Sequence, residues 1–218
     1  MWSVFTNRHT ADHPFRFTDL LELQTKVLSE LRAGQGSALL LAELAPTLTL
    51  GARQMLSATE TSRFKSLSID LVPGERGGNE TWHGPGQWVC FVLTPLQVFT
   101  GDSRGVRKAV YQILENVRQV ASAYLPEAHL REGNELGIWS KQGKLASVGI
   151  KIRDGYVSSG FALNCIETPE SFLNIDPCGI AGSRPDFILR NIQDPASLAE
   201  AFLQIPKQIL EVFEKLKI

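Results

Sequence analysis

The stretch KLASVGIKIRDGYVSSGFALN, residues 144–164, holds two segments rich in apolar residues on either side of Asp154-Gly155. Asp-Gly is a typical two-residue turn of a tight antiparallel hairpin, because both residues tolerate the positive φ that the turn requires. We therefore predict one strand over Lys144–Arg153 and a second from Gly155 to Asn164, paired as a hairpin. This pairing favours an antiparallel or mixed sheet.

Four further segments, all before the hairpin, have the composition of strands. They are Ser37–Ala42, Leu67–Val72, Trp88–Thr94 and Leu136–Ser140. Apolar residues at helical spacing predict three helices, over Asp19–Arg32, between Asp102 and Pro126, and from Pro195 onward. Thr18 and Asp194 are suitable N-caps, and Gly34 can end the first helix. Pro206 is expected to kink or split the last helix, because proline lacks the amide donor and clashes with the preceding turn.

Helices mixed with such a sheet indicate a single α+β domain over residues 1–218, with a mixed or antiparallel sheet flanked by helices. A chain of 218 residues that is 43% hydrophobic can bury a core without disulfides or metals.

The charge balance, the apolar runs and the number of cysteines each exclude some classes of protein. There are 22 basic and 23 acidic residues, which argues against electrostatic binding to nucleic acid. Apolar runs are too short to cross a bilayer, and Met1–His9 shows no secretory pattern. Three cysteines are too few and too scattered for a disulfide framework, and the four histidines show no metal-ligand spacing. We expect a reduced, cytoplasmic protein without metal or cofactor.

Glycine and polar residues gather at three places that follow or begin predicted strands. The first is the segment 75–87, ERGGNETWHGPGQ, in which paired glycines allow a backbone to approach a ligand closely. A plain surface loop is the simpler alternative for this segment. The second is Lys144–Gly149, where small residues leave room for a ligand beside the strand. An exposed lysine at a strand end is the simpler alternative there.

The third place is Cys178, which lies between Pro177 and Gly179. This setting predicts a tight turn, and it suits an exposed nucleophile better than the apolar surroundings of Cys90. Cys165 ends a predicted strand and fits either role. A free thiol is only a few per cent thiolate at neutral pH, so a nucleophile needs a neighbour that stabilises the anion. Lys144 and His83 are the two candidates, and spacing does not choose between them.

Four of these segments resemble the motifs of one enzyme family in its order and spacing. The run RGGNETWHGPGQ, residues 76–87, closely resembles the glycine-rich signature of the lipoyl(octanoyl) transferases, or octanoyltransferases. KLASVG at residues 144–149, GFALN at 160–164 and PCGI at 177–180 resemble its remaining motifs. The resemblance implies the fold of the biotin and lipoate protein ligase catalytic domains.

The resemblance also implies a role for each matched residue. Cys178 would take the octanoyl group from acyl carrier protein as a thioester, and Lys144 would lower the pKa of that thiol and exchange protons with the acceptor amine. The acceptor would be a lysine of lipoyl domains in 2-oxoacid dehydrogenase complexes or of the glycine cleavage H protein. The substrate pocket would be formed by Arg76, Gly77, Gly78, Asn79, Glu80, Thr81, Trp82, His83, Ser147, Val148, Gly149, Gly160, Phe161 and Ala162. Val148, Phe161 and Trp82 are expected to flank an apolar tunnel for the acyl chain.

This chain departs from the family pattern at several positions. Trp82 stands where tyrosine is usual, and Ser159 stands where histidine is usual. Ala45 replaces a histidine, and the segment 181–186 lacks the usual Val-Thr-Ser. Three alternatives stay open: an ATP-dependent lipoate protein ligase, a non-catalytic module that binds carriers or lipoyl domains, and a Cys/His hydrolase. Arg104, Arg107 and Lys108 are candidates for a basic patch that binds an acidic carrier.

Overall fold

The computed structural model describes residues 2–34, 36–51, 55–73, 80–169, 171–172 and 183–215. Within these ranges the strands form one large mixed sheet and one small sheet. The prediction of an α+β fold is confirmed.

The large sheet has the strand order β1-β2-β6-β12-β9-β8-β7. Its first two strands pair in parallel, and the other neighbours along this path are antiparallel. The bounds are β1 Trp2–Arg8, β2 Ser37–Glu43, β6 Gln87–Pro95, β12 Gly160–Asn164, β9 Lys144–Gly149, β8 Gly137–Trp139 and β7 His129–Arg131. The motif strands β9 and β12 are therefore direct neighbours in the middle of the sheet.

The Asp154-Gly155 hairpin is confirmed, but each predicted strand is divided in two. Short strands β10 (Ile152–Arg153) and β11 (Tyr156–Val157) flank the turn, where Asp154 has φ 49° and Gly155 has φ 78°. The breaks come at residues 150–151 and 158–159, which lie outside the strands. The Ser158 amide still donates to the Lys151 carbonyl across the hairpin, and its own carbonyl accepts from the side chain of Gln24. The outer hairpin thereby separates from β9 and β12.

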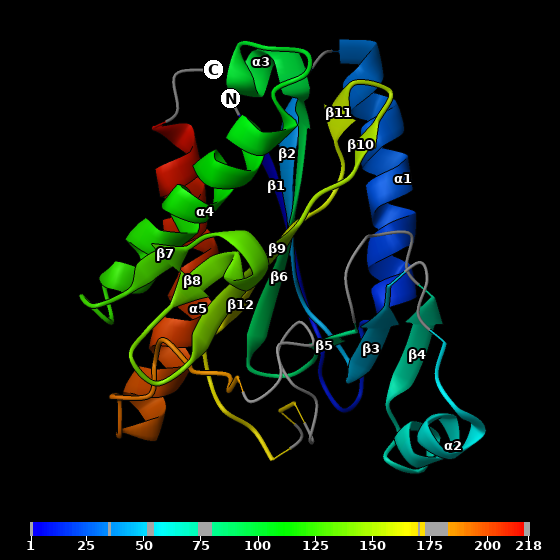
Figure 1. Cartoon of the computed structure of the whole chain (residues 1–218), viewed down its shortest axis with the longest axis vertical. Coiled ribbons are helices and arrows are strands. Elements are labelled where there is room, and N and C mark those ends of the chain that lie inside the picture. The colour runs from blue at the N-terminus through cyan, green and yellow to red at the C-terminus, as the bar shows by residue number, and fades with distance from the viewer. Residues whose placement is uncertain are drawn as a thin grey trace.

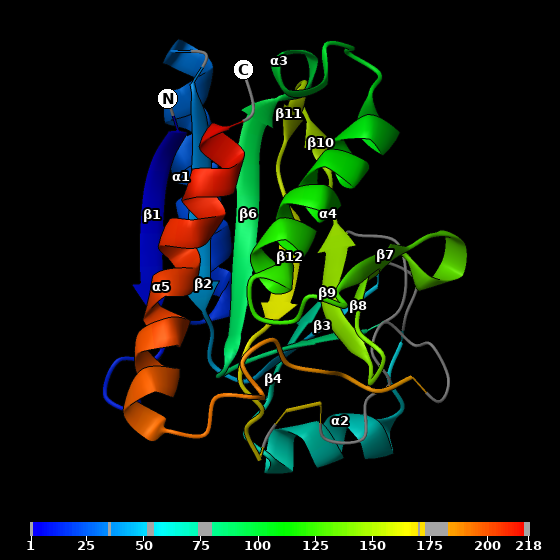
Figure 2. The same cartoon turned by 90° about the vertical axis from the view of Figure 1, so that its left-hand side faces the viewer.

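The large sheet is covered on both faces (Figure 1). Helix α1 (Phe17–Gly34) packs on one face against Ala38, Leu40 and Ala42, while α4 (Val106–Ser122) and α5 (Pro195–Glu214) pack on the other face with Leu39 and Leu41. Figure 2 shows α5 running in front of β1 and β2, and α4 running in front of β12. Coverage on both faces explains why β2 and β6 are apolar at nearly every position rather than alternating.

The three predicted helices are confirmed with small changes of their ends. Helix α1 already begins at Phe17, so Thr18 lies inside its first turn and not at the cap. The Asp194 carboxylate caps α5 by accepting from the Ser197 amide at 2.8 Å. Pro206 was expected to kink or split this helix, and it does not split it: α5 is continuous, and Pro206 is buried inside it beside Ile205. Packing of this apolar face against the core offsets the missing hydrogen bond.

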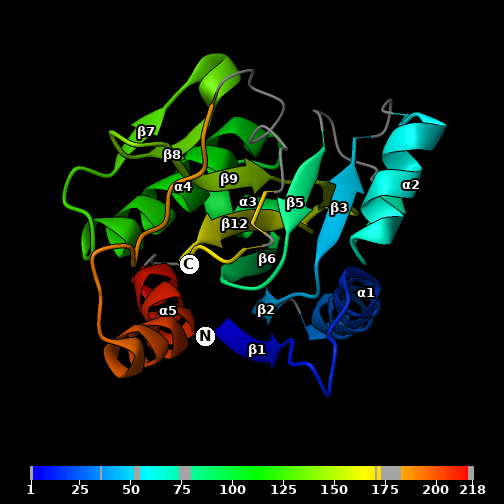
Figure 3. The same cartoon turned by 90° about the horizontal axis from the view of Figure 1, so that it is seen from below.

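A small sheet, β4-β3-β5, lies at the lower end of the large one (Figures 1 and 3). Its strands are β4 Asp70–Pro73, β3 Thr47–Leu50 and β5 Thr81–His83. Before β4 comes helix α2 (Ala58–Ser66), with a capping box between Ser57 and Glu60. The predicted strand Leu67–Val72 is thus wrong at its start, because Leu67 closes α2 and Ser68 turns the chain with φ 57°.

The remaining elements are the helix α3 (Leu96–Thr100) and the 3₁₀ turn η1 (Gly133–Glu135). In the ranges that the structure describes, no helix is both long and apolar enough to cross a membrane.

Candidate active site

A cavity of about 420 Å³ lies between α1, the small sheet and the large sheet. Helix α1 contributes Phe17, Leu21, Gln24 and Thr25, and the small sheet contributes Thr49, Pro73, Thr81 and His83. The large sheet and its hairpin contribute Val89, Phe91, Ser147, Val148, Gly149, Lys151, Arg153, Ser158, Ser159, Gly160, Phe161 and Ala162. Three of the segments selected from the sequence therefore meet at one cavity.

Small residues on β9 and β12 create the space. Gly149 pairs with Gly160 and Ser147 pairs with Ala162, so these two cross-strand pairs carry almost no side-chain volume. Gly160 is required at its position, because a Cβ there would lie 2.0 Å from the Cys90 carbonyl oxygen on β6. Phe161 also lines the cavity, but its ring stacks on Phe213 in the core beneath α5.

Trp82 does not line the cavity. Its side chain is 1% exposed and packs in a separate cluster with Phe172, at a ring distance of 5.2 Å, and with Leu48. Alternation along β5 explains this outcome, since Thr81 and His83 face the cavity and the residue between them points away. Trp82, which was expected to flank an acyl tunnel, is therefore not among the described residues that line this cavity, whereas His83 is.

Lys144 is buried, with 2% of its surface exposed, which excludes an ordinary exposed lysine at a strand end. Its Nζ lies 5.4 Å from the centre of the Trp139 ring on β8. Gly137 makes room for this side chain: a Cβ there would lie 2.7 Å from Cε and 3.3 Å from Nζ of Lys144. Lys144 starts β9 three residues before Ser147, which places it about 10 Å along the strand from the cavity floor.

The backbone of Lys144 holds the chain that follows Cys178. The Lys144 amide donates to the Arg184 carbonyl at 2.8 Å, and the Asp186 amide donates back to the Lys144 carbonyl at 2.9 Å. Gly143 permits this contact, since a Cβ there would lie 2.4 Å from the Arg184 oxygen. The described chain thus returns to Lys144 six residues after Cys178 in the sequence.

A chain of hydrogen-bonded, buried side chains joins the cavity to the backbone carbonyl of Lys144. His83 Nδ1 lies 2.7 Å from Gln87 Oε1, Gln87 Nε2 donates to Asn164 Oδ1 at 2.9 Å, and Asn164 Nδ2 donates to the Lys144 carbonyl at 3.0 Å. His83 also stacks on Phe17 at a ring distance of 5.5 Å. Gln87 and Asn164 each end a sequence motif, and neither was selected as a site residue from the sequence.

Comparison with known proteins identifies a family model and several relatives that match most of the chain. The family model of the lipoyl protein ligase A/B catalytic domain matches residues 17–210. The octanoyltransferase of Geobacter sulfurreducens is 34% identical over 187 residues, which cover 85% of this chain and 75% of that protein. The Danio rerio protein named octanoyl-[acyl-carrier-protein]:protein N-octanoyltransferase LIPT2, mitochondrial, is 33% identical over 178 residues, 81% of this chain and 75% of that one.

The chain belongs to the octanoyltransferase family. It is therefore an enzyme of the acyltransferase class. The fold of this octanoyltransferase family member is shared with lipoate-protein ligase A bound with ATP, at a TM-score of 0.63 and 12% identity over 96% of this chain and 85% of that one.

The family resemblance selected several residues that lie outside the described ranges: Arg76, Gly77, Gly78, Asn79 and Cys178. Glu80 is described, but it is not among the residues that line the cavity. The other two thiols of this octanoyltransferase family member, Cys90 and Cys165, are fully buried, and burial raises the pKa of each well above its ordinary value. Neither is suited to act as a thiolate.

A buried ionic network near Lys144 was not predicted. Asp186 is 4% exposed and accepts hydrogen bonds from Ser140 and Arg190, while its other oxygen accepts from the Phe187 amide at 2.8 Å. Arg190 donates further to Glu127 at 2.9 Å. A backbone hydrogen bond and, less strongly, this contact with Arg190 lower the pKa of Glu127. A lone aspartate after a proline gives no signal of this role in the sequence.

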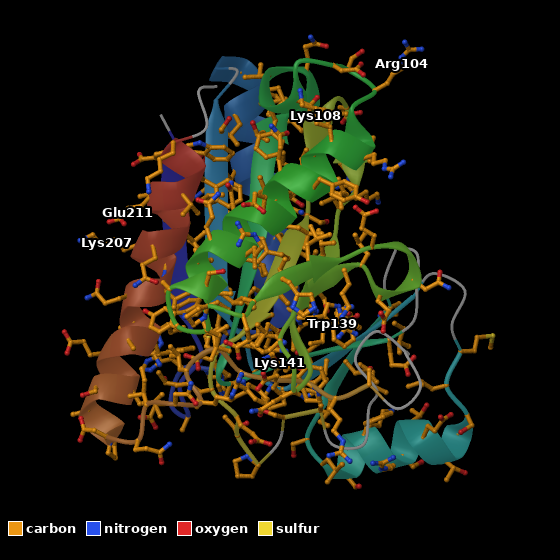
Figure 4. The ribbon with its side chains drawn as sticks, turned by 60° about the vertical axis from the view of Figure 1, so that its left-hand side comes forward. Arg104, Lys108, Trp139, Lys141, Lys207 and Glu211 are labelled. Carbon is orange, nitrogen blue, oxygen red and sulfur yellow. The ribbon has the colours of Figure 1, made fainter. Side chains whose placement is uncertain are left out.

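The basic residues proposed for carrier binding lie away from the site. Arg104 precedes α4, and Arg107 and Lys108 lie in its first turn, on the face of the sheet opposite to α1 and the cavity. Figure 4 shows Arg104 and Lys108 near the upper end of the molecule, with Trp139 and Lys141 lower down. Lys151 and Arg153 instead bring cationic side chains to the cavity itself.

Proposed function

We propose that this chain transfers an octanoyl group from the thioester of acyl carrier protein, through a thioester on Cys178, to a lysine of a lipoyl domain. This function is the first step of endogenous protein lipoylation, and we place it in the cytoplasm. The single observation that carries the proposal is the position of Lys144: a buried lysine on the strand that also forms the cavity floor, in a member of the octanoyltransferase family.

The two steps balance without a cofactor. In the first, the Cys178 thiolate attacks the donor carbonyl, a new thioester forms, and the carrier leaves as a thiolate that takes a proton from the Lys144 ammonium, so that Lys144 becomes neutral. In the second, the acceptor amine attacks this thioester, an amide forms, and Cys178 leaves as a thiolate. The amine must lose a proton before or during its attack, and a buried lysine beside the reacting carbonyl is suited to receive it.

The cavity is suited to an acyl chain. Phe17, Leu21, Val89 and Phe91 provide apolar surface, and each methylene of a chain buried there contributes about 0.8 kcal/mol. A volume of about 420 Å³ lies within the usual range for small-ligand pockets. Lys151 and Arg153 at the same cavity would favour an acidic carrier.

The test is intact-protein mass spectrometry after mixing the chain with octanoyl-acyl carrier protein, followed by addition of an apo lipoyl domain. We expect an octanoyl adduct on the wild type that passes to the lipoyl domain, and no adduct on Cys178→Ala. Lys144→Ala should lose transfer, whereas Lys141→Ala, an exposed lysine three residues away, should retain it. Cys165→Ala is the matched control for the thiol.

The alternatives predict different masses in the same experiment. A lipoate protein ligase would modify the lipoyl domain only with ATP and free octanoate. A hydrolase would release octanoate without an acceptor. A binding module would form neither adduct nor product, and that result would overturn the proposal.

A further inference from the structure

A chain of hydrogen bonds runs from His83 through Gln87 and Asn164 to the backbone of Lys144. The choice of donor and acceptor along this chain is fixed at the Lys144 end. The Lys144 carbonyl can only accept, so Asn164 must present its amide group, Nδ2, to it, at 3.0 Å. The other end of the Asn164 side chain is then a carbonyl oxygen, Oδ1. That oxygen lies 2.9 Å from Gln87, which must therefore present its own amide group.

A second carbonyl fixes the orientation of Gln87 independently. Gln87 Nε2 also lies 3.4 Å from the Trp82 carbonyl oxygen. A flipped Gln87 would bring its oxygen against two acceptors in an interior where both residues are nearly inaccessible, with Gln87 at 2% and Asn164 at 4% exposure. Unpaired buried acceptors of this kind cost about 1–3 kcal/mol each.

This orientation of Gln87 fixes the tautomer of His83. Gln87 Oε1, at 2.7 Å from His83 Nδ1, is an acceptor, so Nδ1 must carry the proton. In the neutral imidazole, Nε2 is then the nitrogen with the lone pair. His83 is 7% exposed and lines the cavity, and its ring is held by stacking on Phe17.

We propose that Gln87 and Asn164 are positioning residues that hold His83 as its Nδ1–H tautomer and tie it to the Lys144 strand, so that Nε2 serves as a hydrogen-bond acceptor in the reaction. The part of this inference that concerns the reaction rests on the proposed function. The tautomer itself does not, since it follows from the carbonyl and amide groups of the resting protein.

The first measurement is a long-range ¹H–¹⁵N spectrum of the histidine side chains at a pH where imidazoles are neutral, with the His83 signals identified by their loss in His83→Asn. We expect the Nδ1–H pattern for His83. His13, whose side chain is exposed, is the internal comparison. An Nε2–H pattern for His83 would overturn the inference whether or not the chain transfers octanoyl groups.

Two variants separate positioning from mere packing. Gln87→Glu keeps an acceptor for Nδ1–H, whereas Gln87→Met has similar length and no acceptor. We expect Gln87→Glu to keep the Nδ1–H pattern, although its second oxygen loses the donor contact with Asn164, and to transfer faster than Gln87→Met, which should lose the pattern and at least about tenfold in rate, the equivalent of one hydrogen bond. A purely structural role predicts the reverse order, because a buried carboxylate disrupts packing more than a thioether does.

The outcomes for the two proposals can be told apart. If the wild type shows the Nδ1–H pattern but transfers no octanoyl group, the proposed function is wrong and the tautomer assignment is unaffected. If Gln87→Glu and Gln87→Met transfer the octanoyl group at equal rates, Gln87 is not a positioning residue and the proposed function is unaffected.

Discussion

The Lys144 ammonium lies 5.4 Å from the centre of the Trp139 ring, and the Arg131 guanidinium lies 4.5 Å from the same ring. The indole is fixed independently of Lys144, because its Nε1 donates to the Glu135 carbonyl at 2.7 Å. Trp139 is 4% exposed, so the lysine meets a preformed and largely dry aromatic surface. A cation over a desolvated indole gains about 2 kcal/mol.

Trp139→Leu should therefore slow the proposed transfer by roughly 10- to 30-fold, which corresponds to about 1.4–2 kcal/mol. The measurement is the single-turnover rate of octanoyl transfer, with circular dichroism to confirm the fold. Arg131→Gln is the matched control, since it removes the other cation on the ring and leaves Lys144 in place. Wild-type rates in Trp139→Leu would show that the ring does not position the lysine.

Gly137→Ala should displace Lys144 and strain the backbone. Gly137 has φ +152°, and a Cβ there would lie 2.5 Å from the Ala146 oxygen and 2.7 Å from Lys144 Cε. We expect a loss of about 1–3 kcal/mol in the free energy of unfolding, measured in urea, together with loss of transfer.

Gly133→Ala provides the comparison for this change. Gly133 has φ +66°, and no atom lies within 4 Å of the position that a Cβ would take there, so alanine would add backbone strain without a clash. Its substitution should cost about 1 kcal/mol and leave transfer unchanged. Equal loss of transfer in both variants would mean that the effect of Gly137→Ala is not exerted through Lys144.

Much of this arrangement could be predicted from local sequence. Asp154-Gly155 specifies its turn chemically, and the long helices carry an apolar face that no other packing would bury. The motif GFALN also marks a strand on which Gly160 is required, since a Cβ there would lie 2.0 Å from the Cys90 carbonyl oxygen. These features depend on residues that are neighbours in the chain.

The parts that were missed depend on residues distant in the sequence. Trp82 faces away from the cavity because β5 pairs with β3, and nothing in the segment 81–83 specifies which face the cavity takes. Asp186 and Ser140 are 46 positions apart, and their contact exists only once Arg184 has docked on Lys144. Strand β1 was missed because it pairs in parallel at the sheet edge and shows no clean alternation of exposure.

Asp186→Ala should be strongly destabilising. It leaves Arg190 and Ser140 without their buried acceptor, and removal of one partner of a buried ion pair costs roughly 3 kcal/mol. Chemical denaturation measures the change. Asp70→Ala is the control, because its ion pair with Arg16 is long, at 3.9 Å, and both side chains are largely exposed. That variant should lose well under about 1 kcal/mol.

Alkylation should distinguish the thiols. Burial raises the pKa of Cys90 and Cys165, so both stay protonated in the folded protein as the pH rises from about 7 to about 9. We expect neither to react with iodoacetamide over this range until denaturant is added, with peptide mass spectrometry as the readout. Labelling of Cys90 or Cys165 in the native protein that rises with pH would contradict their burial.

Ala162→Leu should shorten the acyl chain that the enzyme accepts. Ala162 pairs with Ser147 on the cavity floor, so the added carbons of leucine occupy space that the end of an octanoyl chain would otherwise fill. Loss of about two buried methylenes at about 0.8 kcal/mol each predicts a preference for hexanoyl over octanoyl donors that is raised roughly tenfold. Acylation rates measured with butyryl, hexanoyl, octanoyl and decanoyl carrier protein test this. Thr25→Leu places a leucine at the exposed side of the same cavity and should leave the preference unchanged. A uniform loss across all chain lengths in Ala162→Leu would instead mean that the acyl chain does not reach this floor.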